Sequence, residues 1–133
     1  MSPSNPVRVL FVCVENSNRS QMAEAFARLL GRGAVDAHSA GSRPSGQINP
    51  RAVAAMAELG YELAPHRSKS LKDLPPGPWD AVVTMGCGDS CPQLSARLRE
   101  DWAISDPREM GPEEFRKVRD QVRDQVAALL ARV

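Results

Sequence analysis

A short apolar segment that runs directly into a polar loop and then into a helix is the feature that most constrains the fold. Residues 7–12 read Val-Arg-Val-Leu-Phe-Val, and such β-branched runs are typical of strands buried on both faces of a parallel sheet. Beyond the loop, apolar residues recur at helical spacing from Met22 to Leu30, and Gly31 and Gly33 end the pattern. The chain is therefore predicted to begin with a strand, a loop and a helix.

The alternation of strands and helices continues along the chain. We expect strands over residues 35–39 and 79–85, a helix that starts at Asn49-Pro50, a helical turn over 70–74, a short edge strand over 102–104 and a long helix from about Pro112. This order predicts an α/β fold, with a parallel sheet, helices on both faces and a ligand site beyond the carboxyl ends of the strands. No repeat or linker divides the sequence, so residues 1–133 are expected to form a single domain.

Composition excludes several classes of protein. The chain has 17 Lys and Arg residues against 16 Asp and Glu residues, which argues against a nucleic-acid-binding protein or a polybasic membrane anchor. No apolar run approaches the roughly 18 residues that span a bilayer, and the first residues lack the pattern of a signal peptide. We therefore expect a cytoplasmic protein that does not bind membranes, with a monomer as the default state. The three cysteines are an odd number, which does not suit a framework of structural disulfides.

The loop after the first predicted strand has the pattern C-x5-R-S, from Cys13 to Arg19 and Ser20. A loop this short before a helix directs successive backbone N–H groups into one concavity, and the helix dipole adds positive charge there. An oxyanion is the expected ligand, with Arg19 as a planar charged donor over it. The same field favours the thiolate of Cys13, which would then act as a nucleophile. The expected oxyanion-binding residues are Val14, Glu15, Asn16, Ser17, Asn18, Arg19 and Ser20.

A buried cysteine that acts as a small hydrophobic residue is the simplest alternative for Cys13. The C-x5-R pattern alone occurs often by chance. Here it lies between a strand and a helix and is followed by Ser-Gln-Met-Ala-Glu, which favours the catalytic interpretation.

These residues resemble the low-molecular-weight protein tyrosine phosphatases and the arsenate reductases that share their fold. The likeness extends over nearly the whole chain, through Val-Leu-Phe-Val-Cys, Asn-Ser-x-Arg-Ser-Gln-Met-Ala-Glu, Ser39-Ala40-Gly41, Asn49-Pro50, Val83-Thr84-Met85 and Asp106-Pro107. The resemblance implies a three-layer α/β/α fold with a four-stranded parallel sheet. It also implies that Cys13 is the nucleophile and that Asp106 is the general acid. Glu15 departs from the pattern, because many relatives have glycine there, and we expect its side chain to face solvent.

Two further cysteines separate the reductases from the phosphatases. Cys87 follows the Val-Thr-Met strand, as the second cysteine of the resembled reductases does, and Cys91 lies four residues later. The resemblance implies arsenate reduction through a Cys13-Cys87 disulfide and then a Cys87-Cys91 disulfide. Thioredoxin, glutaredoxin or a low-molecular-weight thiol would reset the enzyme. The alternatives are a phosphatase that acts through a Cys13 phosphocysteine, and an oxyanion or redox sensor without turnover.

No cofactor or metal is expected. Cys87 and Cys91 without a nearby histidine make a poor zinc site. A further alternative is that the two thiols are inert. Some related reductases bind a monovalent cation through groups that align with Asn16, Glu24 and Ser39, and this chain has Lys69 where an acidic ligand would be expected. The Lys69 ammonium is expected to replace the ion, unless it is simply a solvated surface charge. His66 is expected to brace the site rather than to act as a base.

Overall fold

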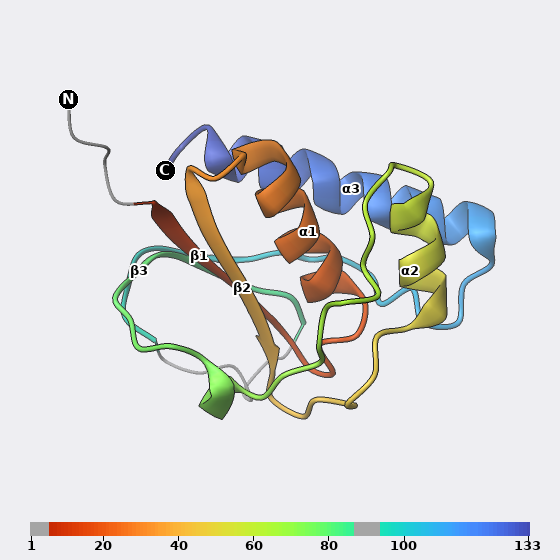
Figure 1. Ribbon diagram of the computed structural model, residues 1–133, viewed down its shortest axis with the longest axis horizontal. Coiled ribbons are helices and arrows are strands. Elements are labelled where there is room, and N and C mark those ends of the chain that lie inside the picture. The colour runs from red at the N-terminus through yellow and green to blue at the C-terminus, as the bar shows by residue number, and fades with distance from the viewer. Residues whose placement is uncertain (1–5, 87–93) are drawn as a thin grey trace.

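A four-stranded parallel sheet forms the centre of the computed structural model, which describes residues 6–86 and 94–133 (Figure 1). The strands are β1 (Val7–Cys13), β2 (Val35–Gly41), β3 (Trp79–Thr84) and β4 (Ala96–Asp101). Their order across the sheet is β2-β1-β3-β4, and every neighbouring pair is parallel. The carboxyl ends of all four strands therefore lie at one edge, where the sequence predicts the ligand site.

The helices match the predicted order. They are α1 (Arg19–Gly31), α2 (Pro50–Ala57), the 3-10 helix η1 (Leu71–Asp73) and α3 (Pro112–Leu130). The predicted start of α2 is confirmed, because the Asn49 side chain accepts a hydrogen bond of 2.9 Å from the Arg51 N–H and Pro50 occupies the first turn.

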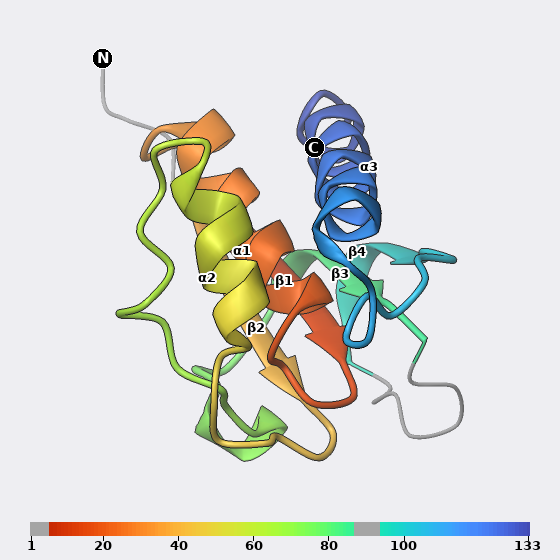
Figure 2. The same cartoon turned by 90° about the vertical axis from the view of Figure 1, so that its right-hand side faces the viewer.

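The two faces of the sheet are covered unequally (Figure 2). Helices α1, α2 and α3 pack on the face that presents Val9, Phe11 and Val83. The opposite face presents Leu10, Val12 and Val82, and the residues against it include Leu71 and Leu74 of the η1 segment. The three-layer α/β/α arrangement is thus present, with a full helical layer on one side and, in the described part of the chain, one 3-10 turn on the other.

The predicted edge strand over residues 102–104 is wrong in position, because the fourth strand is Ala96–Asp101. Its residues alternate between half-buried and exposed side chains. Four of the six residues are charged, so the strand lacks the apolar run that marks a buried strand in the sequence. Trp102 follows the strand, and its backbone N–H donates to the Thr84 carbonyl at 2.8 Å. The chain then leaves the sheet and carries Ile104 and Asp106 toward the end of β1.

The loop after β1 lies against the end of β2. A Cβ on Gly41 would lie 2.5 Å from the carbonyl oxygen of Val14 and 3.1 Å from the backbone nitrogen of Asn16, so only glycine allows this approach. Among the described helices, none is both long enough and apolar enough to cross a membrane.

Candidate active site

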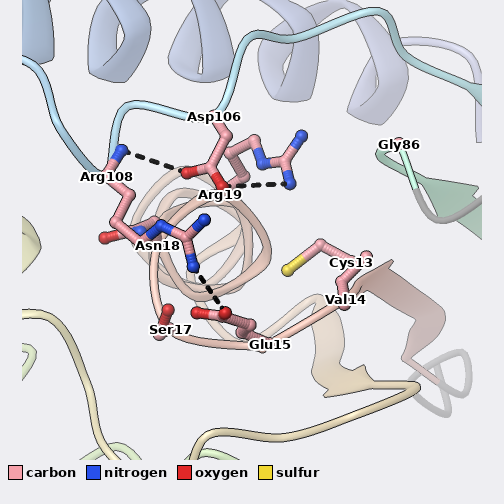
Figure 3. Close-up of a pocket in the computed structure, with 9 residues that line it drawn as sticks. All are labelled: Cys13, Val14, Glu15, Ser17, Asn18, Arg19, Gly86, Asp106 and Arg108. Atoms are coloured by element: carbon pink, nitrogen blue, oxygen red, sulfur yellow. Dashed lines mark hydrogen bonds and ion pairs between the residues drawn. The ribbon is translucent and has the colours of Figure 1, made fainter.

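A cavity of about 340 Å³ opens at the carboxyl edge of the sheet (Figure 3). Three segments that are distant in sequence line it: the loop after β1, Gly86 after β3, and the segment after β4. The lining residues are Cys13, Val14, Glu15, Ser17, Asn18, Arg19, Gly86, Asp106 and Arg108. The structure therefore brings Cys13, Arg19 and Asp106 to one cavity, as the strand order predicts.

The backbone of the loop is held from outside through its carbonyl groups. The carbonyl oxygens of residues 13, 14, 15 and 17 accept hydrogen bonds from the N–H groups of residues 42, 43, 45 and 49, at 2.8 to 3.3 Å. The Asn16 carbonyl accepts a further bond from the Gln21 side chain at 3.1 Å. Because the carbonyls are bonded to surrounding segments, the N–H groups of the loop are the ones left to meet an anion in the cavity.

Cys13 is 3% exposed, and its sulfur lies 2.8 Å from the Ser20 hydroxyl. The Asn16 amide nitrogen donates to the same hydroxyl oxygen at 2.8 Å. Since that oxygen accepts from Asn16, the serine proton is free to point at the sulfur. Ser20 can thus donate to a Cys13 thiolate, which stabilises the charged form.

The orientation of Asn16 is set by its own neighbours. Its side-chain oxygen accepts from the Gln21 side chain and from the Lys69 N–H, each at 2.8 Å, so the amide nitrogen must face Ser20. Asn16 also adopts a left-handed backbone conformation, with φ of 53°, which asparagine tolerates better than most residues. Asn16 and Ser20 are buried and do not line the cavity, so they support the loop from behind.

His66 continues this network away from the cavity. Its Nδ1 lies 3.0 Å from the Gln21 side-chain oxygen and its Nε2 lies 2.7 Å from the Tyr61 hydroxyl. Burial lowers the pKa of His66 from its ordinary value of 6.5, which favours the neutral ring, with Nδ1 donating to Gln21 and Nε2 accepting from Tyr61. These contacts match the expectation that His66 braces the site.

Arg19 is held at the upper wall of the cavity shown in Figure 3. The terminal nitrogen Nη1 donates to the Ile104 carbonyl at 2.9 Å, and the terminal nitrogen Nη2 lies 4.0 Å from the carboxylate of Asp106. Gly86 has a φ of +78°, and a Cβ at that position would lie 2.9 Å from the Arg19 guanidinium. The positive φ favours glycine at this position, and a side chain there would also displace the end of the Arg19 side chain.

Asp106 lies on the segment after β4, and its carboxylate accepts a hydrogen bond of 3.0 Å from the Arg108 N–H. The Arg108 side chain reaches the carboxylate of Glu15 at 2.6 Å. The expectation for Glu15 is thus only partly met, because its side chain is 36% exposed yet lines the cavity and pairs with Arg108. The side chains of the other predicted loop residues, Val14, Ser17 and Asn18, also line the cavity.

Sequence reasoning missed Arg108 and the role of Gly86. Arg108 follows Asp106-Pro107 by one position, which is a local signal that its backbone would lie near the acid. Its partner Glu15 is 93 residues away, and nothing in the sequence connects the two. The positive φ of Gly86 likewise depends on how β3 ends beside Arg19.

Two of the groups expected around a cation, Glu24 and Ser39, lie next to each other, and Glu24 is 3% exposed. Its carboxylate accepts from the Ser39 hydroxyl at 2.6 Å and lies 3.5 Å from the Lys69 ammonium. It also pairs with Arg28 at 2.8 Å. Lys69 thus contacts the buried carboxylate, and its side chain is only 26% exposed. Across residues 6–86 and 94–133, no group of three His, Cys, Asp or Glu side chains is arranged to hold a metal.

Cys87 and Cys91, the two thiols predicted to form the relay, lie outside the described residues. Gly86, the last described residue before them, lines the cavity. The described part of the site therefore comprises Cys13, Arg19, Asp106 and the loop after β1.

Comparisons with known proteins agree with this geometry. The sequence profile described as low molecular weight phosphotyrosine protein phosphatase matches residues 8–133. The glutaredoxin arsenate reductase of Synechocystis sp. is 37% identical over 129 residues, covering 95% of this chain and 98% of the relative. A solved structure of an arsenate reductase in the phosphate binding state superposes with a TM-score of 0.88 at 37% identity, over 96% of this chain and 98% of that one.

A thioredoxin-dependent arsenate reductase from Corynebacterium glutamicum is also similar, with a TM-score of 0.79 and 28% identity over 98% of this chain and 63% of that one. The fold, the loop and these relatives agree. This chain is an enzyme that belongs to the low molecular weight phosphotyrosine protein phosphatase family, and its relatives there include arsenate reductases.

Proposed function

We propose that this protein reduces arsenate to arsenite, with Cys13 as the nucleophile and Cys87 and Cys91 as a thiol relay. The observation that carries the proposal is the cavity in which the buried sulfur of Cys13 faces Arg19 and Asp106 (Figure 3). The similarity to arsenate reductases over nearly the full length of both chains supports arsenate as the oxyanion.

The first step is attack of the Cys13 thiolate on arsenic. The loop N–H groups and the Arg19 guanidinium hold the arsenate oxygens and stabilise the charge that develops on them. Asp106 donates a proton to the oxygen that departs, so that water leaves as the sulfur–arsenic bond forms. The product is an arsenate thioester on Cys13, in which arsenic is still As(V).

The second step transfers the electrons. The Cys87 thiolate attacks the Cys13 sulfur, the electron pair of the sulfur–arsenic bond moves to arsenic, and arsenite leaves as As(III). Two thiols are thereby oxidised to the Cys13-Cys87 disulfide. Cys91 then attacks Cys87, which releases the Cys13 thiolate and leaves a Cys87-Cys91 disulfide for an external thiol system to reduce.

The reductant is proposed as a class, since the relatives are named for two different ones. One relative is called a glutaredoxin arsenate reductase and another is called thioredoxin-dependent. A disulfide of Cys87 and Cys91 could be reduced by either, or by a small thiol.

A coupled assay tests the proposal. The protein is incubated with arsenate and NADPH, together with thioredoxin and its reductase, or glutaredoxin, glutathione and glutathione reductase, while NADPH oxidation is followed. Cys13→Ser and Cys87→Ser are expected to abolish arsenate turnover. Cys91→Ser is expected to stop multiple turnover while one arsenite per enzyme is still released, with a Cys13-Cys87 disulfide detected by mass spectrometry.

Full arsenate turnover by Cys87→Ser would contradict the relay. Hydrolysis of p-nitrophenyl phosphate by both the wild type and Cys87→Ser, without arsenate turnover by either, would instead support the phosphatase function. That reaction needs Cys13, Arg19 and Asp106 but neither of the other thiols.

A further inference from the structure

The charged side chains around the cavity alternate in sign. Arg19 lies 4.0 Å from Asp106, the Arg108 backbone N–H donates to Asp106, and the Arg108 guanidinium pairs with Glu15 at 2.6 Å. The two acids and two bases cancel, so the side chains do not make the cavity strongly positive. A carboxylate in an anion-binding loop opposes the binding of an oxyanion unless a cation compensates it.

The backbones on both sides of the Glu15–Arg108 pair are fixed. The Glu15 carbonyl accepts bonds from the Ser45 N–H at 3.1 Å and the Ser68 hydroxyl at 2.9 Å. The Arg108 carbonyl accepts from the Arg51 guanidinium at 3.4 Å. The ion pair therefore joins two anchored walls of the cavity, and Figure 3 shows it on the side opposite Cys13.

The position of the pair also limits what can enter. A group bound to Cys13 directs its leaving oxygen toward Asp106, and in an ester the organic part continues beyond that oxygen. Arg108 lines the same cavity, and it is hydrogen-bonded to Asp106 through its backbone N–H and to Glu15 through its guanidinium. A free oxyanion carries at most a hydrogen at this position and does not need that space.

We infer that Arg108 and Glu15 together determine substrate specificity: Arg108 cancels the adverse charge of Glu15, and the pair disfavours organic phosphoesters relative to a free tetrahedral oxyanion. This inference rests on the proposed function for its substrate, but its charge component applies to any oxyanion.

The test uses Arg108→Gln, Glu15→Gln and the double variant, which leaves the net charge unchanged. Affinity is measured without turnover, as protection of Cys13 from iodoacetamide by inorganic phosphate, with the modified peptide identified by mass spectrometry. Arg108→Gln is expected to weaken phosphate binding about tenfold, because it leaves the Glu15 carboxylate uncompensated. The double variant is expected to recover binding to within about twofold of wild type.

The steric component is measured as the ratio of kcat/KM for p-nitrophenyl phosphate to kcat/KM for arsenate. The double variant is expected to raise this ratio about tenfold. Lys117→Gln with Glu114→Gln is the matched control, because it removes an exposed ion pair of 3.5 Å within α3, and it should change neither readout.

Unchanged phosphate protection in Arg108→Gln, or failure of the double variant to recover it, would overturn the charge component. An unchanged ratio in the double variant would overturn the steric component. If the wild type is protected by phosphate but does not reduce arsenate, the proposed function fails while the protection pattern still decides the role of Arg108.

Discussion

At the scale of single residues, the Cys13 sulfur lies at the end of a chain of side-chain hydrogen bonds that reaches it through the Ser20 hydroxyl. The Ser20 oxygen lies 2.8 Å from the sulfur and accepts from Asn16 at 2.8 Å. Gln21 and the Lys69 N–H fix the orientation of Asn16 in turn. A directed set of hydrogen bonds therefore ends at the sulfur, and each donor in it favours the thiolate.

Ser20→Ala removes the last of these donors. Because a hydrogen bond to a charged group is worth about 1.5 to 3 kcal/mol, we expect alkylation of Cys13 by iodoacetamide at pH 7 to slow by about tenfold or more. Ser42→Ala is the control, since the Ser42 hydroxyl is buried without a hydrogen-bond partner in the described part of the chain. Equal rates in Ser20→Ala and wild type would show that the hydroxyl does not stabilise the thiolate.

At the scale of elements, the ends of strands assemble the cavity. β1 supplies Cys13 and the segment after β4 supplies Asp106. Gly86, which lies two residues beyond the end of β3, lines the same cavity. Since parallel strands present their carboxyl ends at one edge, the loop after β1 meets residues from two other parts of the chain there. The guanidinium of Arg19, at the start of α1, fills the space that the absent side chain of Gly86 leaves.

Gly86→Ala tests this contact. Gly86 and Gly33 both have a positive φ, of 78° and 85°, but nothing lies within 4 Å of a Cβ built on Gly33. Both alanine variants should lose about 1 kcal/mol of unfolding free energy in urea, from backbone strain alone. Only Gly86→Ala should also weaken protection of Cys13 by phosphate, because only it displaces Arg19. Equal phosphate protection in the two variants would contradict the contact.

At the scale of the whole molecule, α2 and α3 are joined at Glu58. Its carboxylate accepts from Arg116 at 2.8 Å and from Arg119 at 2.7 Å, and Arg119 also donates to the Ala55 carbonyl at 3.0 Å. The hydrogen bond from Arg116, followed by that from Arg119, lowers the pKa of Glu58 from 4.5 to about 2. The attachment between these helices therefore depends on pH.

The sign of this dependence follows from the lowered pKa. The unfolded state binds a proton below pH 4.5 and the folded state only near 2, so the stabilisation is complete above 4.5 and is lost as pH falls toward 2. Between about pH 5 and about pH 3, the Tm of Glu58→Gln should therefore fall by less than the Tm of the wild type. Circular dichroism measures both. Glu62→Gln, at an exposed position in the loop after α2, is the control and should follow the wild type. Parallel curves for all three proteins would contradict this role of Glu58.

Much of the fold and part of the site could be predicted from the sequence because their signals are local. Apolar runs mark the buried strands β1 and β3, Asn49-Pro50 marks the start of α2, and the spacing of Cys13 and Arg19 places an anion loop before a helix. The edge strand was misplaced because only two of its residues, Ala96 and Leu98, are apolar, and charged residues occupy the other four positions.

The sequence by itself determined the order of strands and helices, the loop with its cysteine and arginine, and the edge of the sheet at which the cavity lies. These depend on short-range periodicity and on the geometry of parallel strands. Only the tertiary structure decided that Arg108 pairs with Glu15, that Arg19 lies against Gly86, and that Ser20 is oriented toward Cys13. These contacts join segments or side-chain orientations that local sequence does not specify, because they arise when separate elements pack into one three-dimensional arrangement.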